Sequence, residues 1–296
     1  METPSGQIVI PTIRANNTDI FLVDIQTGDA VNLSDHPAND RYAVVSPDGK
    51  WMAFTSDRDG EYNLFVMNFG TRKVRQLTFR KKGEVCYMPS FTGDSRTIVF
   101  GMHGEKPLMA SIPVEGGTIG IIGIGHDPAV SPDGKKIAFT SEDNKCYFVS
   151  TCNFDGTDIK QITFNCNTIG GVFPAWSPDG RMIAFTDMVN GNLEIFKCKP
   201  DGSQVKQLTK LDKFCTPAAW SPDGRYITFR ITGTAFWTDA EASKRIYSER
   251  KADTRPIWIM GSEGENPHVI EPLHYQCSMD GSRPNWLPQK KKITLQ

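Results

Sequence analysis

Short apolar runs alternate with polar turn residues along the whole chain. One stretch shows the pattern clearly, with runs at Pro174–Trp176, Met182–Thr186, Leu193–Phe196 and Val205–Thr209. Runs of this length, bounded by turn residues, are typical of β-strands. We therefore expect four antiparallel strands in this stretch and name them A to D in chain order.

A four-residue turn motif lies between the A and B strands of this pattern and recurs along the chain. Ser-Pro-Asp-Gly begins at Ser46, Ser131, Ser177 and Ser221, and a degenerate copy begins at Thr92. The proline presets φ for a turn, the aspartate can bond to its own backbone, and the glycine adopts the left-handed conformation that closes the turn. A spacing of 39 to 46 residues, with four strands in each repeat, predicts a β-propeller.

Six A strands are predicted, and the last lies at the C-terminus, whereas the chain begins with Gln7–Ile13, a predicted B strand. We therefore expect the C-terminal A strand to complete the N-terminal blade, which removes exposed sheet edges. Lys291–Leu295 competes with Gln7–Ile13 for the same place. The sequence thus predicts an all-β, six-bladed propeller of four-stranded antiparallel blades, forming one domain over residues 1–296. The predicted A strands are Tyr42–Val45, Met88–Phe91, Pro128–Val130, Pro174–Trp176, Pro217–Trp220 and Pro284–Trp286.

The segment Ser46–Gly60, with Asn63–Met67 and Arg75–Thr78 after it, resembles the repeat of TolB-type propellers. The same repeat, called WD40-like or PD40, occurs in oligopeptidase propellers and in oligogalacturonate lyases. The resemblance covers almost the whole chain and implies the propeller fold. Because the shared residues are turn and core residues, it implies no particular activity.

The resemblance to exported TolB proteins implies an export signal and an additional N-terminal domain, and this sequence departs from the family in both. Those proteins bind a peptidoglycan-associated lipoprotein, a partner that the resemblance alone does not assign to this chain. The present chain starts with the polar residues Met1–Pro4 and shows no positively charged, apolar, small-residue signal. We expect a cytoplasmic protein, or a periplasmic or secreted one if a signal peptide has been removed.

Composition narrows the class of partner. The 296 residues are 39% hydrophobic and 23% charged, with a formal net charge of −1. A near-neutral balance argues against nucleic acid, which normally needs a clustered basic face. No apolar run approaches the roughly 20 residues of a membrane span. We expect a soluble monomer that does not bind nucleic acid and has no membrane span.

Seven cysteines, an odd number without framework spacing, favour a reducing compartment over a disulfide scaffold. Cys146, Cys152 and Cys198 lie in predicted C strands, where we expect small buried hydrophobic side chains. Oxidised pairs are the alternative for a secreted protein.

One face of the propeller is expected to carry the function. In a four-stranded antiparallel blade, the D-to-A and B-to-C connections emerge on the same face, at a mouth of the central channel. Each D-to-A connection supplies a Cys or His, and these side chains suit zinc or another transition metal. No CxxC or HxxxH pair, the usual spacing of metal ligands, occurs in the sequence. We therefore expect no cofactor, and a bound divalent metal is the alternative. The Cys and His residues are His36, Cys86, His126, Cys166, Cys215, His274 and Cys277, and the metal candidates are His36, His126, His274 and Gln276.

The same connections carry basic residues and one suggestive pair. In His126-Asp127 the carboxylate could orient or charge the imidazole. These two residues and His274 are the candidates for catalysis. Basic residues here can contact a peptide end or an anionic sugar through carboxylate groups. The ligand-binding candidates among them are Arg41, Lys81, Lys82 and Arg283.

One blade departs from the repeat through a long B-to-C connection, Ile231–Arg255, on the same face. Thr238 or Asp239 could cap a short helix over residues 240–247. Long structured insertions are disproportionately functional, as lids or binding loops. Phe236, Trp237 and Tyr247 offer apolar contact area, whereas Lys244 and Arg245 offer contacts to anions.

Three functions fit these residues. The first is a non-catalytic scaffold that docks a peptide or protein partner at the channel mouth. The second, implied by the resemblance to oligogalacturonate lyases, is a lyase, with or without a metal, that acts on uronic-acid oligosaccharides. It would use His126 or His274 as base or ligand, Gln276 as ligand, and Arg41 or Arg283 as carboxylate clamp. The third is a regulatory propeller of an oligopeptidase-like enzyme; since no Gly-x-Ser-x-Gly motif follows, we expect no peptidase activity from this chain. We favour the scaffold.

Overall fold

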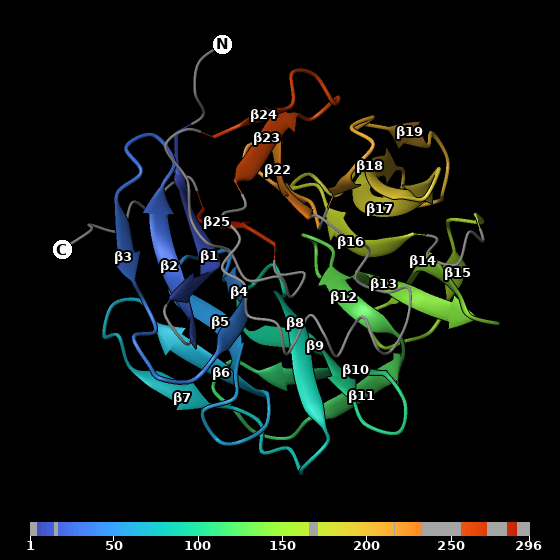
Figure 1. Ribbon diagram of the computed structural model, residues 1–296. Coiled ribbons are helices and arrows are strands. Elements are labelled where there is room, and N and C mark those ends of the chain that lie inside the picture. The colour runs from blue at the N-terminus through green and yellow to red at the C-terminus, as the bar shows by residue number, and fades with distance from the viewer. Residues whose placement is uncertain are drawn as a thin grey trace.

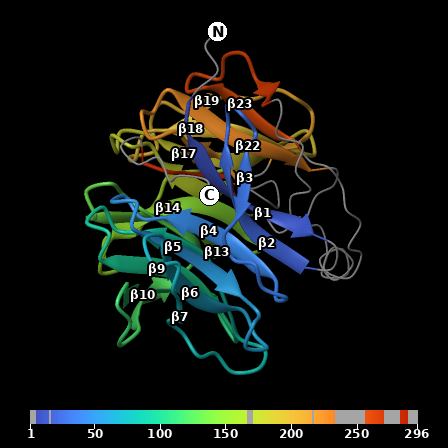
Figure 2. The same cartoon turned by 90° about the vertical axis from the view of Figure 1, so that its left-hand side faces the viewer.

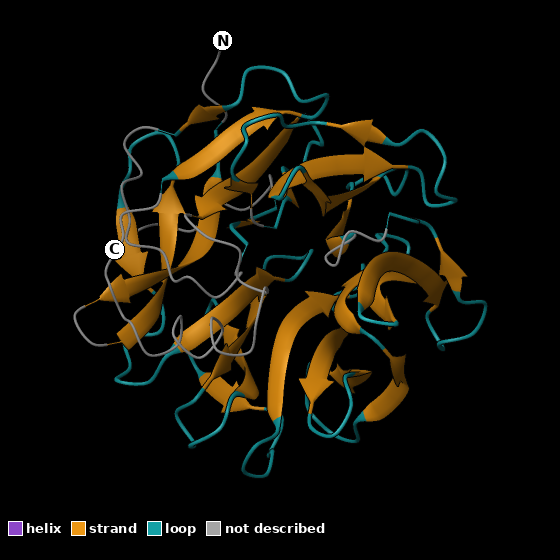
Figure 3. Ribbon diagram, turned by 45° about the vertical axis from the view of Figure 1, so that its right-hand side comes forward, coloured by secondary structure: helices purple, strands orange, loops and turns teal. Residues whose placement is uncertain are grey.

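Six sheets are arranged in a ring around a central axis (Figure 1). The computed structural model describes residues 5–14, 17–165, 171–215, 217–232, 256–270 and 283–288. These residues form 25 strands, and no helix is drawn among them (Figure 3). In this described part of the chain there is accordingly no helix able to cross a membrane. The predicted six-bladed, all-β propeller is confirmed.

Each blade is an antiparallel sheet with four strand positions and its A strand innermost; in blade 6 the A strand is interrupted, and its two short pieces both pair with the B strand. Figure 2 views the ring from the side of blades 1 and 2. Blade 1 holds β1 Gln7–Arg14, β2 Asn17–Asp24, β3 Ala30–Asn32 and β25 Asn285–Trp286; blade 2 holds β4 Asp40–Val45, β5 Trp51–Ser56, β6 Asn63–Asn68 and β7 Val74–Gln76. Blade 3 holds β8 Val85–Phe91, β9 Thr97–His103, β10 Leu108–Pro113 and β11 Gly120–Ile124; blade 4 holds β12 His126–Val130, β13 Lys136–Asp143, β14 Cys146–Asn153 and β15 Lys160–Gln161. Blade 5 holds β16 Val172–Trp176, β17 Ile183–Val189, β18 Asn192–Cys198 and β19 Lys206–Gln207; blade 6 holds β20 Phe214–Cys215, β21 Ala219–Trp220, β22 Tyr226–Thr232, β23 Ile257–Gly261 and β24 His268–Val269.

The C-terminal strand closes the ring, as predicted. Strand β25 pairs antiparallel with β1, with Ile8 opposite Trp286 (Figure 1). The backbone N–H of Leu287 donates to the carbonyl of Gln7 at 2.9 Å. The Asn285 side chain accepts the N–H of Val45 at 3.0 Å, which ties blade 1 to blade 2. The competing segment 291–295 lies outside the described residues.

The turn motif forms the hydrogen bonds that its residue types allow. Ser131 Oγ donates to Asp133 Oδ1 at 2.6 Å and accepts the N–H of Lys136 at 2.9 Å. The same carboxylate oxygen accepts the N–H of Lys135 at 3.1 Å, and Gly134 has the expected φ of 72°. These bonds lower the pKa of Asp133 below its usual value. The same arrangement recurs in the other three copies.

Large and small side chains alternate on the B strands and make neighbouring blades interlock. Consecutive strand residues point to opposite faces of a sheet. In blade 4, Phe139 packs against blade 3, whereas the preceding Ala138 faces blade 5. A phenylalanine occupies this position in five blades and is essentially fully buried in each. One apolar cluster fills each of the six junctions between adjacent blades, including the junction of blades 6 and 1. The five phenylalanines are Phe54, Phe100, Phe139, Phe185 and Phe229.

The cysteines only partly follow expectation. Cys152 and Cys198 are buried free thiols in the inter-blade clusters, as predicted. The prediction is wrong for Cys146, which is half-buried and disulfide-bonded. It starts β14 next to a hairpin turn, so its side chain lies outside those clusters. The cysteines therefore no longer favour a reducing compartment, and the cytoplasmic location stays a prediction.

The degenerate turn of blade 3 has a packing cause. Thr92 and Asp94 keep the hydrogen bonds of the motif, and Ser95 takes the left-handed conformation with φ 63°. Gly93, however, replaces the proline. A Cβ atom on Gly93 would lie 2.0 Å from the carbonyl oxygen of Pro132 in blade 4. Since contact with a backbone atom cannot be relieved by rotating a side chain, only glycine fits there.

We predict that Gly93→Ala destabilises the fold, although it adds only one methyl group. Either the turn or Pro132 must shift, at a cost of about 1–3 kcal/mol, as for other overpacked sites. Urea unfolding of both proteins measures this difference in free energy of unfolding. Gly123→Ala is the matched control, because a Cβ atom there meets nothing within 4 Å. Equal midpoints for the two variants would contradict the packing explanation.

Candidate functional site

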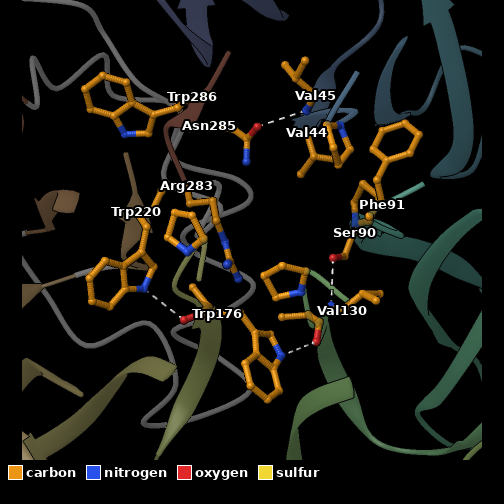
Figure 4. A pocket seen from close by; sticks show the side chains of 18 of the residues that line it. Val44, Val45, Ser90, Phe91, Val130, Trp176, Trp220, Arg283, Asn285 and Trp286 are labelled. Atoms are coloured by element: carbon orange, nitrogen blue, oxygen red, sulfur yellow. Dashed lines mark hydrogen bonds between the residues drawn. The ribbon is translucent and has the colours of Figure 1, made fainter. Parts of the chain in front are cut away.

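The channel inside the ring holds a cavity of about 420 Å³, which we call the axial cavity. The A strands of all six blades and the prolines of the turn motif line it. The indole N–H of Trp176 donates to the carbonyl of Ala129 at 3.0 Å, and that of Trp220 to Ala175 at 3.1 Å. These bonds link neighbouring blades around the cavity, and the Arg283 side chain points toward its centre (Figure 4).

A second cavity, of about 480 Å³, lies at the channel mouth and is rich in aromatic side chains. The first residues of four A strands line it, together with residues next to the B-to-C connections. It therefore lies on the face that the sequence singled out, and the exposed His103 stands at its edge. We call it the aromatic pocket; its lining is Arg41, Tyr42, Tyr62, Val85, Cys86, Tyr87, Met88, His103, His126, Asp127, Thr140, Tyr147, Val172 and Phe173.

The inner strands bulge where they reach the aromatic pocket. The pairing of β4, β8, β12 and β16 with the neighbouring B strand shifts register at the same repeat position. A residue other than glycine adopts positive φ there in each strand, a conformation that costs about 1–3 kcal/mol. The residues are Tyr42 (51°), Met88 (46°), Asp127 (50°) and Phe173 (57°), and all four line the pocket.

The Tyr87 ring packs where the neighbouring strand has a glycine and therefore no side chain. It lies opposite Gly101 of β9, where a Cβ atom would come within 2.6 Å of the tyrosine ring. The absence of that side chain lets the ring lie directly on the strand backbone. The Tyr87 hydroxyl then forms a hydrogen bond with His126 Nδ1 at 3.2 Å. Burial raises the pKa of Tyr87 far above its usual value, so the hydroxyl keeps its proton.

His126 is a neutral, largely buried imidazole. Burial lowers its pKa, and the nearby Glu142 only partly opposes this. Its ring packs edge-on against Tyr147, with ring centres 6.0 Å apart. Glu142 Oε2 lies 3.8 Å from His126 Nε2, too far for a hydrogen bond, and this buried nitrogen has no such partner among the described residues. We assign the proton to Nε2, because a lone pair there would face a carboxylate.

Asp127 is buried and interacts with the centre of the channel rather than with His126. Its Oδ2 accepts a hydrogen bond from Thr140 Oγ1 at 3.2 Å. Burial raises the pKa of Asp127 to about 6, and the positive charge of Arg283 opposes this rise. Arg283 also donates to the carbonyl of Pro174 at 3.2 Å. The electrostatic coupling of Asp127 and Arg283 thus connects the aromatic pocket to the axial cavity.

The structure brings some predicted site residues together and separates others. Arg41, His126 and Asp127 line the aromatic pocket, and Arg283 couples to it. The predicted pairing within His126-Asp127 is wrong: the carboxylate near the imidazole is Glu142, because Asp127 adopts positive φ at the bulge and its carboxylate accepts a hydrogen bond from Thr140 instead. The remaining catalytic and ligand-binding candidates on residues 233–255 and 271–282 lie outside the described residues; they are Phe236, Trp237, Lys244, Arg245, Tyr247, His274 and Gln276.

Other predicted residues lie away from the pocket. Lys81 and Lys82 are exposed and do not line either cavity, so their role in binding stays a prediction. His36 accepts the N–H of Ala38 through Nδ1 at 3.1 Å. In the part of the chain that the structure describes, no three His, Cys, Asp or Glu side chains form a group that could hold a metal.

The sequence analysis missed the aromatic lining. Tyr42, Tyr62, Tyr87, Tyr147 and Phe173 come from four blades and have no common sequence motif. One signal was available: where other B strands place threonine or a larger residue after the buried phenylalanine or its equivalent, blade 3 places Gly101. That departure marks the position on which Tyr87 rests.

The coupling of Asp127 to Arg283 predicts a measurable shift. Replacing Arg283 by glutamine removes the charge that opposes burial, so the pKa of Asp127 should rise above 6. Carbon-13 NMR titration of the carboxyl group, assigned with Asp127→Asn, measures it. Because the folded pKa exceeds the unfolded value of 3.8, this residue should also make the protein less stable as pH rises from 3.8 to 6. An unchanged pKa in Arg283→Gln would contradict the coupling.

Two curated relatives match parts of the chain. A protein TolB homolog of Chlorobaculum tepidum is 28% identical over 99 residues, covering 33% of this chain and 22% of that protein. A protein TolB homolog of Chlorobium luteolum is 26% identical over 145 residues, covering 46% of this chain and 31% of that protein. The matched segments thus span less than a third of either relative.

Solved structures share the architecture at low identity. TolB from Acinetobacter baumannii has a TM-score of 0.74 at 19% identity, over 96% of this chain and 67% of that chain. A putative TolB from Agrobacterium tumefaciens has a TM-score of 0.72 at 17% identity, over 97% of this chain and 100% of that chain. An oligogalacturonate lyase in complex with manganese has a TM-score of 0.57 at 18% identity, over 86% of this chain and 70% of that chain. These identities show the fold alone.

The family match covers more of the chain than either curated relative does. The PD40 family, described as TolB beta propeller domain, matches residues 3–122 and 118–259. Together these segments cover residues 3–259, from β1 to within β23, whereas β24 and the closing strand β25 lie outside them. The protein therefore belongs to the TolB β-propeller domain family.

Proposed function

We propose that this protein is a non-catalytic scaffold that docks a peptide or protein segment at the channel mouth, with the aromatic pocket as its anchor site. The observation that carries the proposal is the pocket itself: a cavity of about 480 Å³ whose aromatic lining comes from several blades. Such pockets, mostly apolar with a few polar groups, are typical binding sites. A single apolar side chain buried in one contributes about 1.5–3 kcal/mol.

The polar groups of the pocket are engaged with one another, which favours binding over chemistry. Tyr87 is bonded to His126, and Asp127 to Thr140. Paired in this way, they fix the shape of the lining before a ligand arrives. A preorganised lining on strands loses little conformational entropy on binding. Membership of the TolB propeller family also supports a docking role.

A random peptide library displayed on phage tests the proposal. We expect wild-type protein to enrich a set of peptides, and Tyr147→Ala to weaken their binding at least about tenfold, as for anchor positions. Tyr147 is partly exposed, so its truncation should leave the fold intact. Lys50→Ala is the control, because this exposed lysine belongs to a turn on the opposite face. Peptides that bind both variants equally, or a library with no enrichment, would contradict docking at this mouth.

The uronide-lyase alternative is favoured by one observation: Arg41 and His126, its candidate clamp and base, line the same pocket. A lyase would convert oligogalacturonate into an unsaturated product that absorbs ultraviolet light, and His126→Ala would abolish this. The assay is run with added manganese, zinc or calcium, after the metal content of the purified protein has been measured. We expect no product under any of these conditions; product that depends on His126 would replace the scaffold by the enzyme.

A further inference from the structure

The aromatic pocket has an apolar part, to which the inner strands of blades 3 and 5 contribute. Met88, Val172 and Phe173 belong to one buried apolar cluster, and Tyr42, Tyr87 and Tyr147 pack against it. The Tyr87 ring is fixed from behind by the Gly101 backbone. Aromatic side chains arranged around a cavity favour a planar ring as the guest, through stacked and edge-on contacts.

Arg41 supplies a cation at the blade 2 side of the same cavity. Its guanidinium carbon lies 4.8 Å from the centre of the Tyr62 ring. Stacking on an aromatic face restricts the guanidinium while leaving its planar edge of N–H donors in fixed directions. A guanidinium presented in this way matches the two oxygens of a carboxylate.

The other charged groups near the pocket are directed away from a guest. His126 directs Nε2 toward Glu142, 3.8 Å away, and Glu142 itself does not line the pocket. The negative charge of Asp127 is opposed by Arg283 from the channel side. A quaternary ammonium or amine, the other guest that aromatic cages accept, would instead be repelled by Arg41.

From this arrangement we propose that the aromatic pocket binds an aromatic carboxylate, with its ring between Tyr87 and Phe173 and its carboxylate on Arg41. The inference deepens the docking proposal, since it names the chemistry of the group that enters the pocket. That group comes either from a free aromatic acid or from the C-terminal aromatic residue of a peptide. Both present a ring and a carboxylate a few bonds apart.

Isothermal titration calorimetry with small probes tests the chemistry without a partner protein. The probes are 3-phenylpropionate, its neutral amide, phenethylamine and the non-aromatic hexanoate. We expect the aromatic acid to bind about tenfold or more tightly than the amide, as for charge-assisted hydrogen bonds. The amine and hexanoate should bind more weakly still. Equal binding of acid and amide, tighter binding of the amine, or no binding of any aromatic probe would overturn the proposal.

Two variants separate the ring contact from the charge contact. Arg41→Gln should lower affinity for the acid to that for the amide, while leaving the amide unchanged; retained amide binding also shows that the variant is folded. Gly101→Ala should weaken both probes, because its Cβ atom pushes the Tyr87 ring toward the cavity. Arg72→Gln, at an exposed turn of blade 2, is the control and should change neither. An unchanged preference for the acid in Arg41→Gln would overturn the assignment.

The position of the probe and its natural source are read in the same samples. The carbon-13 methyl signal of Met88, assigned with Met88→Leu, should shift on adding the acid; an unshifted signal would overturn binding in this pocket. The dipeptide Gly-Phe, with a free C-terminus, is titrated beside 3-phenylpropionate. If Gly-Phe binds more tightly, the proposal is supported with a peptide as the natural source. If 3-phenylpropionate binds more tightly, the proposal is supported with a free acid as the source. Library peptides that bind while every aromatic acid fails would leave docking intact and remove only this inference.

Discussion

The ring depends on the interlock between large and small side chains on adjacent blades. Each buried phenylalanine, such as Phe139, fills the space left by a smaller residue on the preceding blade, such as Val99. A blade buries its large face only if another blade precedes it, so the array is stable only when it closes. The pairing of β25 with β1 supplies that closure and sets Trp286 into the last junction. Removal of the closing strand would expose an edge and an apolar face together.

Closure also explains how strained residues can persist at the channel mouth. Four inner strands hold Tyr42, Met88, Asp127 or Phe173 at positive φ, which the surrounding structure must offset. The inner strands are fixed by hydrogen bonds between blades, such as Trp176 to Ala129 and Val130 to Ser90. Because the strain recurs in four blades, its first cause is the geometry of the repeat. Its consequence is local: the bulges bring four unlike side chains into one cavity.

The fold could be predicted because its determinants are local and repeated. The Ser-Pro-Asp-Gly turn needs only residues within six positions of one another, and its period counts the blades. The site could not be predicted in the same way, since Arg41, Tyr87 and His126 meet only when three blades are in place. Sequence adjacency even misled: it paired His126 with Asp127, whereas the strand directs one toward Glu142 and the other toward Thr140. Electrostatic partners on different blades are determined by distances in space, and these distances cannot be derived from the spacing of residues along the chain.

Departures from the repeat carry information about the site only when their cause is known. Gly93 and Gly101 both lie in blade 3; Gly93 stands where the other copies of the turn have proline, and Gly101 stands where three other B strands have threonine. A Cβ atom on Gly93 would meet backbone of blade 4, so this glycine serves the junction between blades. A Cβ atom on Gly101 would come within 2.6 Å of the ring of Tyr87, which is hydrogen-bonded to His126 and packs in the aromatic pocket. Since the ring could give way only by leaving that position, Gly101 is best explained by the position it gives Tyr87 in the pocket.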